Sequence, residues 1–217
     1  MRFLITLGVA FLTSALAVAP AAAEFRAGFG TRVITPQGFE TWTDVDGDAQ
    51  YNPDVDTFED ANGNGLFDAA WMAGFQNGRA TKDVHDDLMA VAAVFDDGDT
   101  RIGIVTADVE SGVSEDYMAR LKADMVGALE EASAALEPAR LSMATIEGYD
   151  AALGTMDTRK PLILDPGVRV LMLKRADDSV IGTLVNYGMH VELAWDKNLS
   201  FTADLAGYLR RGLSTGL

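Results

Sequence analysis

Apolar runs alternate with turn-forming residues along much of the chain, and this pattern predicts β-strands. Leu88 to Phe95 and Ile102 to Val109 flank the turn Asp96-Asp97-Gly98-Asp99, which predicts a β-hairpin. A second hairpin is predicted around the turn Ala176-Asp177-Asp178-Ser179. The strands of this hairpin are Val168 to Leu173 and Val180 to Tyr187. The same pattern predicts two single strands, Phe29 to Thr35 and Leu141 to Thr145.

Two stretches have helical spacing instead. Ser114 is a suitable N-cap, Glu115 and Asp116 follow in the first turn, and apolar side chains then recur at helical spacing until Pro138. A second helix is predicted for Ala203 to Leu213. Strands that are apolar on both faces, with helices between them, predict an α/β fold with a layered mixed β-sheet and flanking helices.

The first residues have the pattern of a secretory signal peptide. Met1-Arg2 is basic, residues 3–19 are mostly apolar, and Ala21-Ala22-Ala23 is a small-residue cleavage pattern. We therefore expect residues 1–23 to be removed, residues 24–217 to form the domain, and the protein to be secreted or periplasmic. The alternative is an uncleaved anchor; no later stretch is long and apolar enough to cross a bilayer.

Composition narrows the classes of partner and chemistry. The 217 residues include 33 Asp and Glu against 17 Lys and Arg, a formal charge of −16, which argues against nucleic acid as a partner and against docking on anionic lipid. Without cysteine there is no thiolate nucleophile, and a metal must be held by oxygen or by histidine nitrogen. Only His85 and His190 supply such nitrogens.

The negative charge is concentrated in an insertion at residues 40–70. No Lys or Arg lies between Arg32 and Arg79, whereas nine acids do. This stretch contains a repeat at an offset of sixteen residues, with the form D-x-[DN]-G-[DN]-[AG]-x-aromatic-[DN]. The two copies begin at Asp44 and Asp60.

The repeat has the spacing of a calcium loop, because oxygen side chains at alternate positions can converge on one ion while a small residue at position 6 permits a sharp turn. Neither copy has the bidentate Glu at position 12, which leaves Asp54, Asp56 or Glu59 to supply it. Tyr51, Phe58, Phe67 and Trp71 would anchor the insertion, so the expected role is structural, and a solvated acidic loop is the alternative. The predicted calcium ligands are Asp44, Asp46, Asp48, Asn52, Asp60, Asn62, Asn64 and Asp68.

Polar residues follow three predicted strands, where chemistry collects in α/β sheets. The segments are Thr106-Ala-Asp108, Thr145-Ile-Glu147 and Asn186-Tyr-Gly-Met-His190. A histidine that ends an apolar strand is also common as a packing residue.

Four ordered motifs resemble the N-terminal part of the neutral/alkaline nonlysosomal ceramidase family. The motifs resemble that family's A-G-x-x-x-x-D-I-T-P opening, its G-V-H-D-P-L and S-x-D strand, its N-[FW]-x-x-H-P motif and its S-A-D-x-P-G-Y-L-R-R motif. They are Ala27-Gly-Phe-Gly-Thr-Arg-Val-Ile-Thr-Pro36, Val84-His-Asp-Asp-Leu88 with the strand ending at Asp108, Val185-Asn-Tyr-Gly-Met-His190, and Thr202-Ala-Asp-Leu-Ala-Gly-Tyr-Leu-Arg-Arg211.

The resemblance implies a secreted zinc amidase that cleaves the N-acyl bond of ceramide, a lipid-like amide, with His190 as a zinc ligand. The family's H-T-H-S-G-P motif is replaced here, since Ile146 and Gly148 stand at its histidine positions, and the family's Glu and Tyr ligands lie beyond Leu217. A catalytic zinc needs about three protein ligands. The candidates near the site are His85, Asp108, Glu147, Asp204 and Tyr208.

Three interpretations follow. The first is a ceramidase-like hydrolase that is inactive as this chain alone. The second is a non-catalytic, calcium-binding exported module that has lost the zinc site, and the third is a truncated reading frame without a stable fold. The missing H-T-H motif favours the second interpretation for the isolated chain.

Overall fold

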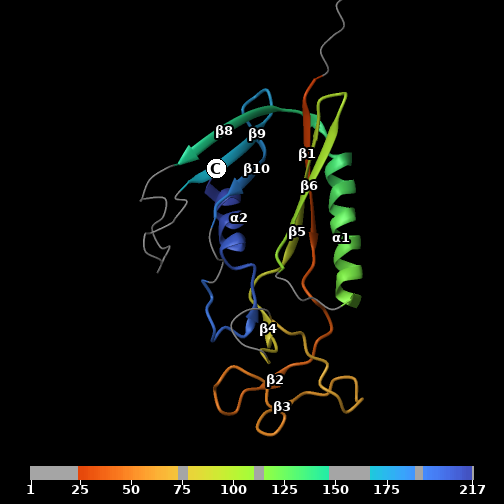
Figure 1. Ribbon diagram of the computed structural model, residues 1–217, viewed down its shortest axis with the longest axis vertical. Coiled ribbons are helices and arrows are strands. Elements are labelled where there is room, and N and C mark those ends of the chain that lie inside the picture. Colours follow the sequence, from red (N-terminus) through yellow and green to blue (C-terminus); the bar gives the residue numbers. More distant parts are fainter. Residues whose placement is uncertain (1–23, 73–77, 110–114, 147–166, 189–192, 217) are drawn as a thin grey trace, which may run out of the picture.

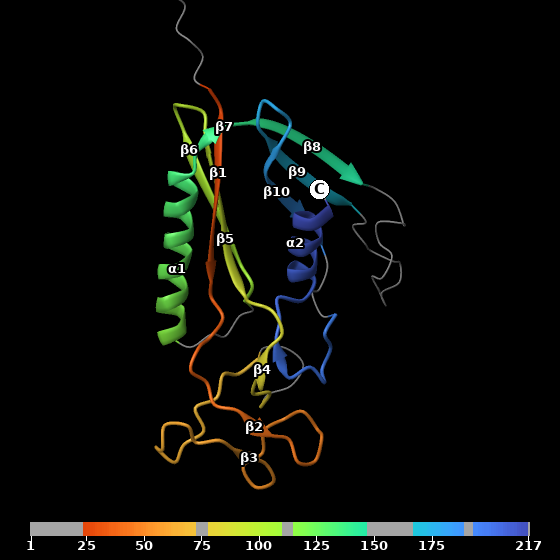
Figure 2. The same ribbon diagram turned by 180° about the vertical axis from the view of Figure 1, so that it is seen from behind.

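The molecule has an upper body and a lower lobe. The structure is a computed structural model that describes residues 24–72, 78–109, 115–146, 167–188 and 193–216. In Figures 1 and 2 the two larger sheets and both helices form the upper part, which we call the body, and the loops of residues 40–72 form the lower end, which we call the acidic lobe.

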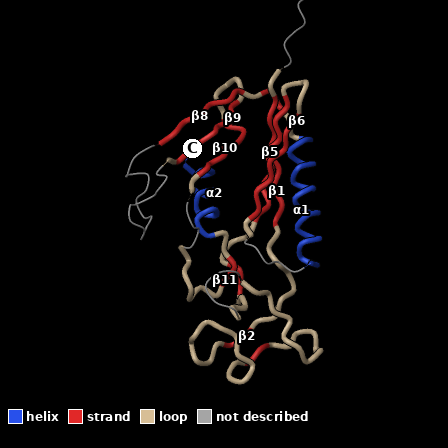
Figure 3. Tube along the Cα trace, viewed as in Figure 1, coloured by secondary structure: helices blue, strands red, loops and turns tan. Residues whose placement is uncertain are grey.

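The first sheet of the body is antiparallel throughout. It contains β1 (Arg26–Val33), β5 (Met89–Asp96), β6 (Arg101–Ala107) and β7 (Glu137–Pro138) in the order β6-β5-β1-β7. Helix α1 (Glu115–Ala134) runs along one face of this sheet (Figure 3). This sheet and its helix therefore form a two-layer unit.

Small residues let β1 lie close against α1. A Cβ atom at Gly30 would stand 2.2 Å from the carbonyl oxygen of Ala128, and one at Gly28 would stand 2.1 Å from that of Ala132. Since real Cβ atoms do not approach backbone this closely, glycine is required at both positions. Ala128 and Ala132 are fully buried in the same layer, so the contact is one of backbone against backbone.

The second sheet is also antiparallel and packs beside the first. Strands β8 (Arg140–Ile146), β9 (Val168–Lys174) and β10 (Val180–Asn186) follow the order β10-β9-β8. A Cβ atom at Gly182 would lie 2.2 Å from a ring carbon of Phe29 in β1, so this glycine in β10 makes room for the ring. Helix α2 (Asp204–Gly216) lies below this sheet in Figure 1.

Two short strand pairs connect distant parts of the chain. Strands β4 (Asp83–Val84) and β11 (Ser200–Phe201) are parallel, which places residues 85 and 202 side by side at the base of α2. Strands β2 (Trp42–Thr43) and β3 (Thr57–Phe58) are antiparallel within the acidic lobe.

The predicted α/β class, both hairpins and both helices are confirmed. Helix α1 ends at Ala134 instead of continuing to Pro138, because Glu137 and Pro138 pair with β1 as strand β7. The predicted signal peptide, residues 1–23, lies outside the described residues. Among the described residues, neither helix has the length and apolar character needed to cross a membrane.

Candidate functional site

The first loop of the acidic lobe is closed by its own aspartates. Both carboxylate oxygens of Asp44 accept backbone N–H groups, from Gly47 at 2.8 Å and from Ala49 at 3.1 Å. Gly47 and Ala49 have φ angles of +74° and +66°. One oxygen each of Asp44, Asp46 and Asp48 lie within 4.8 Å of one another. Two oxygens that ligate one calcium at 2.3–2.6 Å are at most about 5 Å apart, so these three oxygens are close enough to share one ion, and their role as calcium ligands stays a prediction.

The second loop repeats this geometry sixteen residues later. Asp60 accepts the N–H groups of Gly63 at 2.7 Å and Gly65 at 2.8 Å, and the two glycines have φ angles of +74° and +77°. Both asparagine side chains of the loop donate to the carboxylate of Asp68, at 2.6 Å and 2.9 Å. The two copies of the sequence repeat therefore fold as two equivalent loops. The loop residues that the calcium prediction names here are Asp60, Asn62, Asn64 and Asp68.

Two buried acids hold the loops together, and the sequence interpretation did not single them out in this role. The Asp56 carboxylate accepts the N–H groups of Val45 at 2.9 Å and Asn52 at 2.8 Å in the first loop. The Glu40 carboxylate accepts the N–H groups at the same two positions of the second loop, 2.8 Å and 3.0 Å away. Glu40 and Asp56 are themselves sixteen residues apart, and each lies ahead of one loop and binds the other.

The sequence contains a signal for this exchange. Extending the repeat upstream aligns Glu40-Thr-Trp-Thr-Asp44 with Asp56-Thr-Phe-Glu-Asp60, which share an acid, a threonine and an aromatic residue before the loop. Both oxygens of Asp56 accept backbone N–H groups in the structure. Its role as a bidentate calcium ligand stays a prediction.

Aromatic rings form the inner side of the acidic lobe. Tyr51 and Phe67 occupy the same position in the two loops, and their ring centroids are 4.3 Å apart. Trp42, Phe58 and Trp71 make further ring contacts with this pair. The four aromatic anchors expected from the sequence therefore lie in one cluster.

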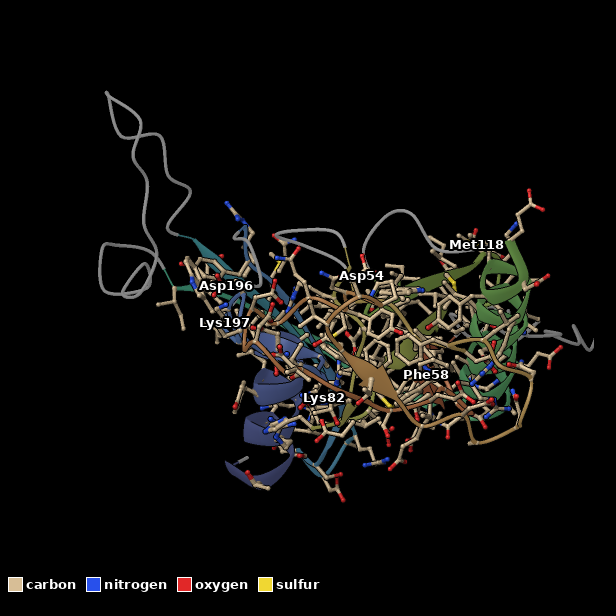
Figure 4. The ribbon with its side chains drawn as sticks, turned by 90° about the horizontal axis from the view of Figure 1, so that it is seen from below. Asp54, Phe58, Lys82, Met118, Asp196 and Lys197 are labelled. Carbon is tan, nitrogen blue, oxygen red and sulfur yellow. The ribbon has the colours of Figure 1, made fainter. Side chains whose placement is uncertain are left out.

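Polar contacts connect the acidic lobe to the chain before α2. Lys197 Nζ donates to the carbonyl oxygen of Asp48 in the lobe over 2.9 Å. Arg79, which follows the lobe in the chain, donates from Nη2 to the carbonyl oxygen of Asn198 over 2.7 Å. Figure 4, seen from below, shows Asp196 and Lys197 on the side toward α2 and Met118 on the side toward α1. The lobe is thus attached to the segment that precedes α2.

Consecutive arginines of α2 bind two aspartates of the body. Arg210 makes a bidentate ion pair with Asp108, with distances of 3.0 Å and 2.6 Å, and Asp108 also accepts the Met89 N–H at 2.9 Å. Arg211 donates to Asp86 at 2.8 Å. These pairs fix α2 against the ends of β5 and β6 and against the segment after β4.

Asp86 is held as a carboxylate by its neighbours. Its Oδ1 accepts the Thr202 hydroxyl at 2.6 Å and lies 3.0 Å from His85 Nδ1, while its Oδ2 accepts Arg211. Burial raises the pKa of Asp86, but the hydrogen bonds from His85, Thr202 and Arg211, together with the Arg211 charge, outweigh burial and lower this pKa to about 2. Asp86 is therefore ionised at neutral pH.

A shallow pocket opens beside this cluster. His85 lines this pocket, and its side chain is 54% exposed. The Asp204 carboxylate holds two of the lining residues in place, because it accepts the N–H groups of Leu193 at 3.0 Å and Ala194 at 2.8 Å. The residues that line the pocket are His85, Leu193, Ala194, Asn198, Thr202 and Tyr208.

Two solved structures resemble this chain in fold. The crystal structure of neutral ceramidase from Pseudomonas aeruginosa has a TM-score of 0.61 over 90% of this chain, at 16% sequence identity. A ceramidase complexed with C2 has a TM-score of 0.60 over 89% of this chain, also at 16% identity. The chain has the fold of part of a neutral ceramidase.

The match covers only part of each ceramidase chain. This chain covers 36% and 35% of the two ceramidase chains, so it spans about a third of their length. No family model matches the sequence, and no curated protein matches it.

The ceramidase-like fold brings only some of the predicted site residues together. His85 and Tyr208 line the pocket, whereas Asp108 and Asp204 bind Arg210 and backbone N–H groups. The other predicted site residues, His190 and Glu147, lie outside the described residues.

The described residues do not fit a catalytic zinc by themselves. The part of the chain that the structure describes contains one group of three potential acidic or histidine ligands, and this group is Asp44, Asp46 and Asp48 in the lobe. At His85 the neighbouring carboxylate, Asp86, already accepts three side-chain hydrogen bonds. The predicted zinc role of His190 stays a prediction.

Proposed function

We propose that this chain is a ceramidase-like domain of a hydrolase that acts on the N-acyl amide bond of a ceramide-like lipid. The fold shared with neutral ceramidase over 90% of the chain carries the proposal. Four sequence motifs in the same order support it, as does the pair of arginines in the last of these motifs, which fixes α2 beside the pocket. Because the chain spans 36% of that ceramidase, the whole enzyme's activity and substrate are proposed here.

The proposal includes a zinc ion for which His190 would be a ligand. When bound, zinc would polarise the amide carbonyl and lower the pKa of a water molecule. Since the described residues outside the lobe contain no group of three potential ligands, we expect this chain alone to hydrolyse amides at background rates. Asp108 and Asp204 would act as positioning residues through the contacts described above.

Zinc uptake tests the proposal. Equilibrium dialysis of the purified chain is expected to show zinc uptake that falls in His190→Ala and is retained in Asp178→Asn, a change at an exposed carboxylate that pairs with Arg140. Equal zinc uptake in the two variants would contradict the zinc role of His190. Fatty acid release from an N-acyl sphingoid substrate, measured on the same samples, shows whether this chain is active without further ligands.

A second candidate function is calcium binding by a non-catalytic exported module. The equivalent loops of the acidic lobe favour it, because each carries aspartate or asparagine oxygens at alternate positions, and one oxygen each of Asp44, Asp46 and Asp48 lies within 4.8 Å of the others. In this proposal the ions fix the lobe, and the lobe contacts the chain before α2 through the hydrogen bond from Lys197 to Asp48.

Calorimetric titration tests calcium binding. We expect heat of binding, and a melting temperature that falls when EGTA is added, because a ligand that binds only the native state stabilises it by about 2.7 kcal/mol at a concentration of one hundred times its Kd. Asp44→Asn and Asp60→Asn should each remove one site, and Asp178→Asn none. No heat and no EGTA effect would rule the proposal out.

Export is proposed on the signal-like pattern of residues 1–23. The N-terminus of the protein recovered from its native host is expected to be Glu24. An intact Met1 or Arg2 in the recovered protein would contradict cleavage.

A further inference from the structure

We propose that the pocket beside α2 binds a neutral hydroxyl group, with His85 Nε2 as the hydrogen-bond acceptor. This inference rests on the proposed function, since it assigns the pocket to the polar head group of an N-acyl amino alcohol. The role of His85 comes from its contacts with Asp86 and Thr202, and the class of ligand comes from the residues that line the pocket.

The contacts of Asp86 decide where the hydrogen of neutral His85 lies. Thr202 Oγ1 accepts the Asp204 N–H at 2.9 Å and lies 2.6 Å from Asp86 Oδ1, so its hydroxyl hydrogen is directed at that carboxylate. An ionised carboxylate only accepts hydrogen bonds. His85 Nδ1, at 3.0 Å from the same oxygen, must therefore carry the hydrogen.

The other ring nitrogen is left as an acceptor. In a neutral imidazole with its hydrogen on Nδ1, Nε2 carries a lone pair. Asp86 is itself fixed by Arg211 at 2.8 Å, and Gly207 of α2 permits this approach because a Cβ there would stand 2.2 Å from Asp86 Oδ2. The imidazole thus has a set tautomer and a set orientation at the pocket wall.

The lining indicates a neutral ligand. None of the six lining residues is Asp, Glu, Lys or Arg, although 23% of the chain is charged. Of the nearest charges, Asp86 is paired with Arg211, and both oxygens of the Asp204 carboxylate accept backbone N–H groups. Among the described residues, the lining therefore offers hydrogen-bonding groups and apolar surface rather than charged side chains.

The lining also combines hydrogen-bonding and apolar groups. Tyr208 and Asn198, whose side chains can form hydrogen bonds, line the same pocket as His85, and Leu193 and Ala194 provide apolar surface. A hydroxyl on a short carbon chain satisfies both kinds of neighbour. The head group of an N-acyl amino alcohol has this chemistry.

The tautomer is tested by nitrogen NMR of the imidazoles in the full chain. With only two histidines, His85→Phe identifies the signals. We expect neutral His85 to have a protonated Nδ1 and an unprotonated Nε2, and Asp86→Asn to shift this ratio toward protonated Nε2. Asp178→Asn, an exposed Asp→Asn change, should leave the ratio unchanged. A protonated Nε2 in the unmodified chain would overturn the proposal.

Binding is tested with N-acetyl-2-aminopropane-1,3-diol and, as a matched probe without hydroxyls, N-isopropylacetamide. The diol is expected to shift the His85 Nε2 signal and to bind about tenfold more weakly to His85→Phe, as for one lost hydrogen bond. The matched probe should leave the signal in place. No shift with the diol, or equal shifts with both probes, would overturn the proposal. The titration uses no zinc, so failed hydrolysis leaves its outcome unaffected.

Discussion

The body and the acidic lobe are held together by different interactions. In the body, glycine and alanine let β1 approach α1, and buried aliphatic side chains fill the space between layers. In the lobe the strands are two residues long, and carboxylates accept backbone N–H groups in both loops. Trp42 and Ala49 are the buried apolar residues of the lobe's described part.

This difference shows which part of the molecule depends on charge. Burial of apolar surface stabilises the body without regard to ions, at about 25 cal/mol per Å². The lobe places acids close together without a Lys or Arg of its own, so its loops repel one another unless a cation is bound. Each of the following changes tests one side of this comparison.

The largest effect is expected in the core of the body. Leu121 is 4% exposed between α1 and the first sheet, so Leu121→Ala should lower the free energy of unfolding by about 2–5 kcal/mol. Urea denaturation measures this, and the loss should be the same with calcium and with EGTA. Val126→Ala on the same helix, where the side chain is 53% exposed, should change it by less than about 0.5 kcal/mol. Equal losses in both variants would show that α1 does not pack as described.

The two buried acids of the lobe should produce a crossed pattern. In Glu40→Gln an amide NH₂ replaces one accepting oxygen, which weakens hydrogen bonds worth about 1.5–3 kcal/mol to charged groups. Amide hydrogen exchange should then speed up at Ala61 and Asp68 in the second loop, about tenfold or more.

Asp56→Asn should speed up exchange at Val45 and Asn52 in the first loop instead. Asp178→Asn removes the same charge from an exposed position outside the lobe and serves as the control. If each variant instead sped up hydrogen exchange in the loop that directly follows the mutated residue in the sequence, the crossed hydrogen bonding between the two repeats would be wrong.

Asp86 joins α2 to the segment after β4, and its effect should depend on pH. Its pKa is lowered to about 2, against about 3.9 for an unfolded aspartate. A carboxyl whose folded pKa is depressed stabilises the protein above the unfolded pKa, and this contribution is lost as the pH falls through the folded pKa.

Asp86→Asn should therefore lower the free energy of unfolding by about 1–2 kcal/mol at pH 7, after allowance for solvent screening. The difference in unfolding free energy between this variant and the unmodified chain should narrow below about pH 4. Urea denaturation at pH 7, 4 and 3 measures this difference. A difference that stays constant down to pH 3 would mean that packing, and not charge, gives Asp86 its effect.

The smallest effect is expected at the surface of the body. Asp178 pairs with Arg140 at 2.8 Å, but its side chain is 76% exposed. Asp178→Asn should change the free energy of unfolding by less than about 0.5 kcal/mol, since solvent screens the pair and asparagine tolerates the φ of +69°. A loss above about 1 kcal/mol would show that this ion pair contributes more than exposed pairs usually do.

Local patterns made the elements predictable from the sequence. The turn at Asp96 to Asp99 and the flanking apolar runs predict β5 and β6 within two residues, and helical spacing predicts α1 and α2. The pairing of β4 with β11 could not be predicted, because two residues give no periodicity and their partners are more than one hundred residues apart. The division of the strands into two sheets depends on such long-range contacts.

The candidate site was predictable only in part. The repeat indicated the loop aspartates, and comparing the residues before each loop would have indicated Glu40 and Asp56 as well. His85 and Tyr208 came from the family resemblance, whereas the tautomer of His85 depends on Asp86, Thr202 and Arg211 meeting in space. No pattern in the sequence places Thr202 and Arg211 beside Asp86.

The central proposal is that calcium orders the loops of the lobe and leaves the ceramidase-like body unchanged. The most direct test is amide hydrogen exchange of the full chain with calcium and with EGTA, read at each residue. We predict that calcium slows exchange at the loop amides of Gly47, Ala49, Gly63 and Gly65 by about tenfold or more, while α1 and β5 exchange at the same rates in both conditions. Equal exchange at the loop amides with and without calcium would contradict the proposal.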